Sequence, residues 1–410
     1  MPNSDVAKAF KLLTLGGVIL ILLAGGFVLE RLSRFNSRVA SLKEQGQPVC
    51  YADLTHEVEE GKSDALPLLF EAAPSANAFF GELSERQLWR KRVSEDLVEQ
   101  FEELAATYPD LFPLLSKASQ CEDISISISD GKLPENDLHR VPFQAVSEVM
   151  QLRIRVLAAQ GKPDDAVRAG IELLRLSRLL EQHTTTLVGR FTTTLDCRKM
   201  AVYALHDVLV AYPISDAVRL ALNEELELHG SMDAFNRSIP GERAAVIETI
   251  GRQAISPTAF NGMAALDYFE DLQRHCQQPV IRLAADFHDF DMIENRTSWF
   301  AQSVAPGYRN VLALECLAIS EVRALRIISA LQTVPDGTDR DAWDREYLDS
   351  IGVPEKMTID ILTGDAMIVR RQDDQWLVYS VGKNGIDDQG RASADHGLPG
   401  LTILMRPLDE

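Results

Sequence analysis

The sequence predicts a mainly α-helical protein, in which an N-terminal transmembrane helix carries a helical-hairpin body and a small C-terminal antiparallel β module. Three observations predict this fold class. Residues 12–29 are continuously apolar or small, apolar residues recur mostly at helical spacing from 61 to 330, and short alternating segments follow residue 366. A period near 3.6 indicates helices with one buried face, whereas a period of two indicates half-buried strands. These patterns divide the chain into a membrane anchor (1–30), a stalk and linker (31–60), a helical domain (61–335) and a β-rich module (336–410).

The first element is the apolar stretch 12–29, which contains no charged side chain. At about 1.5 Å of rise per residue, a helix of this length just crosses the hydrocarbon core of a bilayer. A cleaved signal peptide is the alternative, but its apolar core is shorter and precedes a small-residue cleavage site. Residues 30–34 (ERLSR) contain no such site. The sequence therefore favours an uncleaved single-pass anchor, with the lipid bilayer as its first partner.

The orientation of the anchor is left open by its flanking charges. The basic residues near its two ends are Lys8 and Lys11 on one side, and Arg31, Arg34, Arg38 and Lys43 on the other. This count favours a cytoplasmic body, but long domains can cross a membrane largely regardless of such charges.

Charge and cysteine usage limit the classes of partner and site. The chain has 61 acidic and 41 basic residues, a formal net charge of −20, and the acidic excess lies beyond the first 45 residues. Such a body repels phosphate backbones, so we expect no nucleic-acid partner. The five cysteines are Cys50, Cys121, Cys197, Cys276 and Cys316, and none forms a CxxC pair, which leaves zinc and thioredoxin-like sites without support. Cys197 and Cys316 lie in apolar helical stretches and are expected in the core, while a disulfide among the others stays open.

The helical region begins with a stalk that Gly46-Gln47-Pro48 should break, and its clearest unit is a hairpin. One helix is predicted from 143 to 159 and a second from 164 to 180, joined by Gly161-Lys162-Pro163. This turn resembles the inter-helix turn of tetratricopeptide repeats. Only one copy is present, whereas stable arrays need about three, so we expect helix packing without a peptide-binding groove.

Short extended segments interrupt or follow the helices. Residues 124–129 alternate isoleucine and serine, which predicts a short extended segment before a turn. Near the C-terminus, strands are predicted at 366–370, 375–381 and 401–405. Three strands with one apolar face need a partner surface, and the helical body is the natural candidate.

The C-terminal segment WLVYSVGKNGIDD (376–388) is similar to the C-terminal part of the major pseudopilin of type II secretion systems. Together with DILTG (360–364) and LKEQGQPV (42–49), it more closely resembles uncharacterised membrane-anchored proteins of planctomycete bacteria. This chain departs from the pattern at Ile361-Leu362, where an aromatic residue is expected. The resemblance assigns no activity. It implies that the body lies outside the cytoplasm, because pseudopilins expose their C-terminal modules there.

In the pseudopilin this loop holds calcium, so the resemblance implies a calcium site here. The candidate ligands are Asn384, Asp387, Asp388 and Asp395. Calcium takes six to eight oxygens from carboxylates, amides and carbonyls, and neighbouring glycines allow carbonyls to turn inward. The alternative is an ordinary tight turn at Asn384-Gly385 with solvated aspartates.

The sequence contains no recognised catalytic or nucleotide-binding motif. The patterns GxSxG, GxxxxGKS, GxxxxGKT, HExxH and GxGxxG are all missing, and His275-Cys276 and His288-Asp289 lack the further partners that catalysis needs. Glu242-Arg243 is expected to form an ion pair. We therefore predict a membrane-anchored binding or assembly module. The alternative is a membrane-tethered hydrolase, which a deep pocket gathering His183, His288 or Asp289 would favour.

Overall fold

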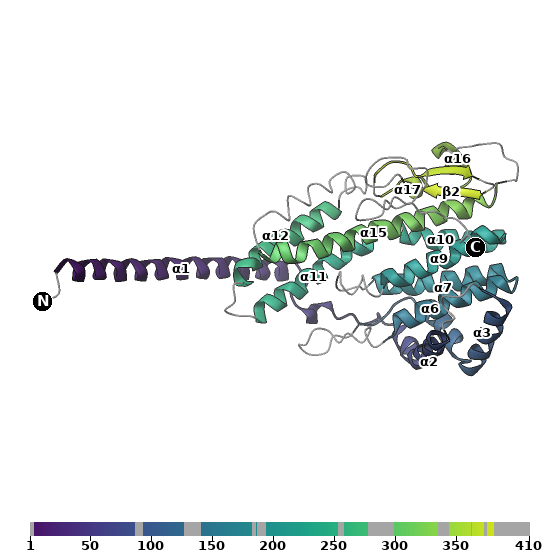
Figure 1. Ribbon diagram of the computed structural model, residues 1–410, viewed down its shortest axis with the longest axis horizontal. Coiled ribbons are helices and arrows are strands. Elements are labelled where there is room, and N and C mark those ends of the chain that lie inside the picture. Colours follow the sequence, from purple (N-terminus) through teal and green to yellow (C-terminus); the bar gives the residue numbers. More distant parts are fainter. Residues whose placement is uncertain are drawn as a thin grey trace.

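The computed structural model describes residues 4–86, 93–126, 141–182, 186, 194–252, 258–277, 299–334, 344–361, 363–372 and 375–380. A long helix, α1, projects from one end of an elongated helical body, and a small β hairpin lies against the opposite end of that body (Figure 1). The mainly helical fold with a small antiparallel sheet is thus confirmed in the described part of the chain.

Helix α1 runs without interruption from Ser4–Glu44 and so includes the whole apolar stretch and the predicted helical stalk. It ends at a turn in which Gly46 has a φ of 71°, a left-handed conformation that glycine adopts without steric cost. The backbone N–H of Gln47 donates to the carbonyl of Leu42 at 3.0 Å, which satisfies one of the last carbonyls of the helix. The predicted break at this position is confirmed.

The first half of the body is a stack of helices on one large core. After the short 3-10 helix Tyr51–Leu54 come α2 (Leu66–Glu85), α3 (Glu95–Thr107) and α4 (Leu111–Ser119). Phe79, Phe101 and Phe112 pack with their ring centroids 5.4 to 5.8 Å apart, and they join these three helices. Of the predicted extended segment, Ile126 forms an antiparallel bridge with His56, and residues 127–129 lie outside the described residues.

The predicted hairpin forms the centre of this half. Helices α6 (Phe143–Ala159) and α7 (Pro163–Gln182) have nearly the expected bounds, and Gly161 makes the turn with a φ of 72°. Helix α9 (Leu195–Ala211) packs across both. Gly170 permits this approach, because a Cβ added there would lie 2.4 Å from a methyl carbon of Leu205.

The second half contains α10 (Asp216–His229), α11 (Asp233–Arg252), α12 (Thr258–Cys276) and the long α15 (Trp299–Leu331). Helix α15 spans both halves: its C-terminal part joins the large core, and its N-terminal part packs with α11 and α12 around Phe235, Phe269 and Leu312. The body is therefore held as one unit by α15 (Figure 1).

The C-terminal module consists of short elements on the surface of α15. Helices α16 (Arg345–Ser350) and α17 (Glu355–Thr358) precede the strands β1 (Ile368–Gln372) and β2 (Gln375–Tyr379), which pair antiparallel with Val369 opposite Val378. The first strand begins later than predicted, because Ala366 instead forms an isolated bridge with Ile359. The predicted third strand, 401–405, lies outside the described residues.

All five cysteines are described, and all five thiols are free. Cys197 and Cys316 are buried as predicted, and Cys276 is buried as well.

Candidate functional site

The predicted calcium ligands Asn384, Asp387, Asp388 and Asp395 lie outside the described residues, as do His183, His288 and Asp289. Within the described part of the chain, no group of three or more His, Cys, Asp or Glu side chains has an arrangement that could hold a metal ion. The calcium site and the hydrolase alternative therefore stay predictions. Two other features of the described residues are candidates for function: the projecting part of α1, and a network of buried charges.

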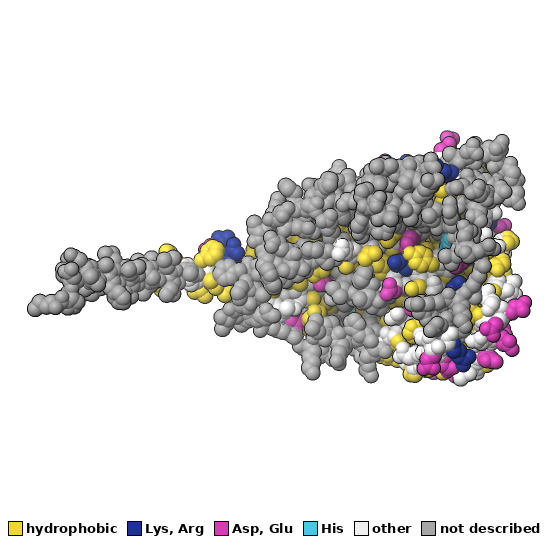
Figure 2. Space-filling view, viewed as in Figure 1, with side chains coloured by type: hydrophobic (Ala, Val, Ile, Leu, Met, Phe, Trp, Pro, Cys, Tyr) yellow, Lys and Arg dark blue, Asp and Glu magenta, His cyan; other side chains and the backbone are white. Residues whose placement is uncertain are grey.

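The projecting part of α1 exposes large apolar side chains. Leu22, Leu23 and Leu29 are 69%, 67% and 69% exposed, and Phe27 is 50% exposed. Figure 2 shows hydrophobic and basic side chains together where α1 leaves the body. Among the residues whose side chains the structure describes, no helix is both long and apolar enough to span a membrane.

Below this part, α1 is docked firmly on the body. Phe35 is buried against Gly262 of α12, where an added Cβ would lie 2.9 Å from the phenylalanine ring. Arg38 donates to the carboxylates of Asp267 and Glu270, also on α12. The segment after α1 continues along the body, since the backbone N–H of Tyr51 donates to Glu248 at 2.6 Å. His56 then lies 3.0 Å from a carboxylate oxygen of Asp123. The apolar helix is therefore joined to the body by a long contact and not by a free linker.

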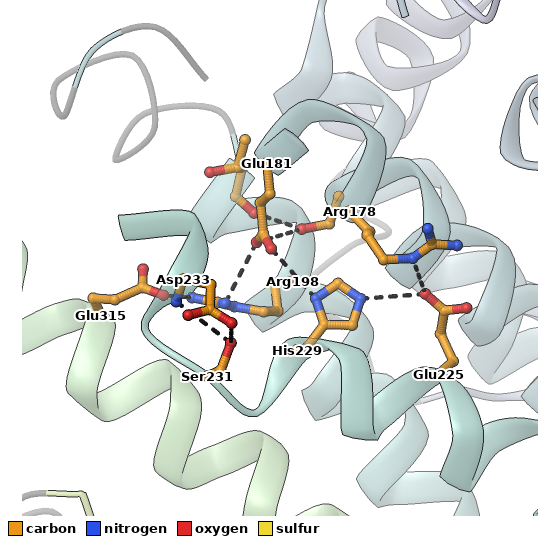
Figure 3. Close-up of polar contacts among 10 residues, drawn as sticks. Arg178, Glu181, Arg198, Glu225, His229, Ser231, Asp233 and Glu315 are labelled. Atoms are coloured by element: carbon orange, nitrogen blue, oxygen red, sulfur yellow. Dashed lines mark hydrogen bonds and ion pairs between the residues drawn. The ribbon is translucent and has the colours of Figure 1, made fainter. Parts of the chain in front are cut away.

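The network of buried charges lies where α7, α9, α10 and α15 meet (Figure 3). At its centre is Arg198 of α9, whose side chain is 1% exposed. Arg198 donates to Glu315 of α15 at 2.8 Å and lies 3.4 Å from an oxygen of Glu181 on α7. Both carboxylates are also almost fully buried. A buried cation between two buried carboxylates is stable only while all three are present.

His229 extends this network to α10. Its Nδ1 lies 3.5 Å from Glu181 and its Nε2 lies 3.4 Å from Glu225, both at ion-pair distance but longer than usual hydrogen bonds. Arg178 and Arg175 approach the same Glu225 carboxylate at 2.8 and 3.2 Å. Burial by itself would lower the pKa of His229, but the two glutamates outweigh it and raise that pKa. The position of the His229 ring between two carboxylates therefore favours its protonated form.

A second set of polar contacts fixes the C-terminal module on α15. Arg323 donates to the carbonyls of Gly230 and Ile359 at 2.8 and 2.7 Å. The buried carboxylate of Asp360 accepts hydrogen bonds from Ser320 of α15 and from Ser380, the residue after β2. Asp360 belongs to the DILTG segment of the sequence, so this segment has a structural role in joining the hairpin to the helical body.

The described side chains include no activated cysteine nucleophile. Burial is the first cause in every case, and it raises the pKa of all five thiols, to about 12 for Cys197 and Cys276. The thiolate is the reactive form, so the raised pKa lowers the reactivity of these thiols. The charged groups around Arg198 bind one another and join helices α7, α9, α10 and α15.

No protein-family model matches this chain, and no curated protein or solved structure is significantly similar to it. The resemblances to pseudopilins and to planctomycete membrane proteins, which depend on short segments, stay predictions.

Sequence reasoning missed the buried network, although a signal for it is present. Glu315 interrupts an otherwise apolar helical stretch, Arg198 follows the apolar Cys197, and Glu225 and His229 are four residues apart on one helix face. Charged residues at core positions require partners, so these positions could have been identified as members of ion pairs. Their partners could not, because Arg198 and Glu315 are 117 residues apart.

Proposed function

We propose that this protein is a single-pass membrane-anchored binding or assembly module, in which residues 12–29 of α1 cross the bilayer. The observation that carries the proposal is the set of exposed leucines on the projecting helix, which includes Leu22, Leu23 and Leu29. Burying one such side chain in an apolar environment contributes about 1.5–3 kcal/mol, so several adjacent ones provide a strong drive into lipid. Apolar patches of this kind mark membrane or protein contacts.

The docking of α1 supports a role in holding the body at a fixed position. Phe35 and Arg38 bind the helix to α12 only a few residues beyond the apolar stretch. The body would therefore lie close to the membrane surface with a defined orientation. On the basis of the pseudopilin resemblance, we further propose that the body is extracytoplasmic. A binding or assembly role is favoured over catalysis by the mutual pairing of the buried charges and by the raised pKa of the thiols.

Extraction of membranes with alkaline carbonate tests the anchor. The full-length chain is expected to stay in the membrane pellet, because carbonate releases peripheral proteins but not helices that span the bilayer. A chain lacking residues 1–30 is expected in the soluble fraction, with the helical signal of a folded body, since the docked part of α1 begins at Phe35. Release of the full-length protein into the supernatant would contradict the proposal.

A further inference from the structure

A polar pocket of about 260 Å³ lies between the docked part of α1 and helices α11 and α12. The polar residues that line it include Arg38 and Ser41 of α1, Gln47 after α1, Arg243 of α11, and Glu270 and Gln273 of α12. Ligand pockets commonly measure about 300–1,000 Å³, so this one suits a small molecule.

Arg243 is the buried cation that lines this pocket. It is 4% exposed, and its guanidinium donates one hydrogen bond, to the side-chain oxygen of Gln47. A guanidinium has five N–H donors, and within the described residues Nε of Arg243 has no partner. No carboxylate of the described residues lies within ion-pair distance of it. Burial is the main cause and lowers the pKa of Arg243; the attraction of Glu270 only partly compensates, and the nearby charge of Arg38 lowers the pKa further.

Two other arginines, Arg38 in the same pocket and Arg323 elsewhere in the body, are satisfied in a way that Arg243 is not. Arg38 binds two carboxylates, those of Asp267 and Glu270. The similarly buried Arg323 donates three hydrogen bonds to backbone carbonyls. A buried cation without a counter-ion is costly, so the pocket beside Arg243 lacks one anionic group.

The other residues that line the pocket limit the charge and the polar groups of that anion. Glu270 lines the same pocket and would repel a ligand with two negative charges. The half-buried amide of Gln273 makes no hydrogen bond within the described residues and offers both a donor and an acceptor. A single negative charge combined with hydroxyl or amino groups fits these constraints.

We propose that this pocket binds a small monocarboxylate that carries hydroxyl or amino groups, with its carboxylate on Arg243 and its polar groups near Gln273 and Glu270. A lipid headgroup is excluded as the source by position, if residue 29 marks the end of the membrane-spanning part. Arg38 follows residue 29 by nine positions, or about 14 Å along the helix, whereas the headgroup layer is only about 5–8 Å thick. The ligand would be a soluble molecule that bridges the anchor helix and the body.

Thermal unfolding of the full chain in detergent, with defined probes, tests the proposal. L-lactate and L-serine carry one carboxylate, with a hydroxyl group in lactate and both hydroxyl and ammonium groups in serine. Ethanolamine has no carboxylate, and inorganic phosphate supplies a doubly charged anion. The two carboxylates at millimolar concentration are expected to raise the melting temperature, because a ligand that binds only the folded state stabilises it. A larger effect of serine than of lactate identifies the source as an amino acid, and the reverse identifies a hydroxy acid.

Variants separate binding from folding. Arg243→Gln is expected to weaken carboxylate binding at least about tenfold and also to raise the melting temperature without ligand, because it removes a buried charge that lacks a counter-ion. A purely structural arginine would instead lower the melting temperature when replaced. Arg219→Gln is the matched control, since Arg219 is a mostly buried arginine that pairs with Asp216 at 2.7 Å, and it should leave the ligand response unchanged.

Gln273→Leu provides a second variant that keeps every charge, and it is expected to weaken binding while the protein stays folded. The proposal is overturned if neither carboxylate changes the melting temperature of the wild type. It is equally overturned if ethanolamine or phosphate alone does so, or if Arg243→Gln and Gln273→Leu respond to the carboxylates as the wild type does.

Discussion

Replacing Arg198 with methionine is expected to lower the free energy of unfolding by about 3–5 kcal/mol, because the change removes the buried cation that contacts two buried carboxylates. Glu315 accepts a hydrogen bond from Arg198 at 2.8 Å, and Glu181 lies 3.4 Å away. Methionine fills most of the same volume, so the loss reflects charge more than a cavity. Chemical denaturation followed by circular dichroism measures the effect.

The control is Arg168→Met, which removes an arginine from an exposed pair with Asp165 on the same group of helices. Exposed pairs contribute at most about 1 kcal/mol, so this variant should unfold almost like the wild type. Adding Glu315→Leu to Arg198→Met should recover part of the lost stability, since the second change removes one of the two carboxylates that Arg198 contacts. Equal stability of the Arg198 and Arg168 variants would show that the buried network contributes no more to stability than an exposed ion pair does.

A second expected result is that the free energy of unfolding depends on pH. His229 is expected to cause the loss of stability as the pH rises above neutrality. The raised pKa of His229 means that the folded state binds its proton more tightly than the unfolded chain does. This contribution is complete below the ordinary histidine pKa of about 6.5 and is lost as the pH rises through the raised folded value. His229→Gln should remove that decline, so the two proteins should differ most in slope above about pH 6.5.

The pKa of Glu225 is shifted in the opposite direction, so Glu225 is expected to cause the loss of stability at acidic pH. Burial by itself would raise the pKa of Glu225, but His229 and Arg178 outweigh it and lower the pKa to about 2. The contribution of Glu225 to stability is present above its ordinary pKa and is lost as the pH falls toward about 2. The shift in its pKa corresponds to about 3 kcal/mol for the whole cluster. Denaturant midpoints measured across this range should therefore be highest between about pH 4.5 and 6.5. A flat profile for both the wild type and His229→Gln would contradict a raised pKa of His229 in the folded state.

The local structure of this chain could be predicted from local patterns. The hairpin α6–α7 has the expected start at Phe143 and the expected turn at Gly161, because apolar spacing and a glycine in left-handed conformation are properties of neighbouring residues. The break after Glu44 was predictable for the same reason. In the C-terminal module, two strands of the expected type occur, with β1 displaced to Ile368 by the bridge of Ala366.

The polar sites could not be predicted in this way, because tertiary contacts assemble them. The Glu242-Arg243 segment was expected to form an intrahelical or interhelical ion pair. Adjacent side chains on a helix point in different directions, and the structure instead has Tyr308 donating to Glu242 and Arg243 donating to Gln47. Gln47 is 196 residues from Arg243, so no local pattern connects them. The pocket at the base of α1 exists only because Phe35 and Arg38 dock that helix on α12.

Flotation of the full chain with liposomes tests the membrane anchor most directly. The test compares variants in which arginines replace exposed leucines either in the apolar stretch or in the body. Leu22 and Leu23 lie near the middle of the apolar stretch, while Leu220 and Leu228 of α10 are almost as exposed, at 61% and 59%, but belong to the body. Arginine at the centre of a membrane helix costs about 2.5–3.5 kcal/mol per residue. The account predicts that Leu22→Arg/Leu23→Arg remains at the bottom of the gradient, whereas Leu220→Arg/Leu228→Arg floats with the lipid like the wild type. Equal flotation of the two double variants, or a wild-type chain that does not float, would contradict it.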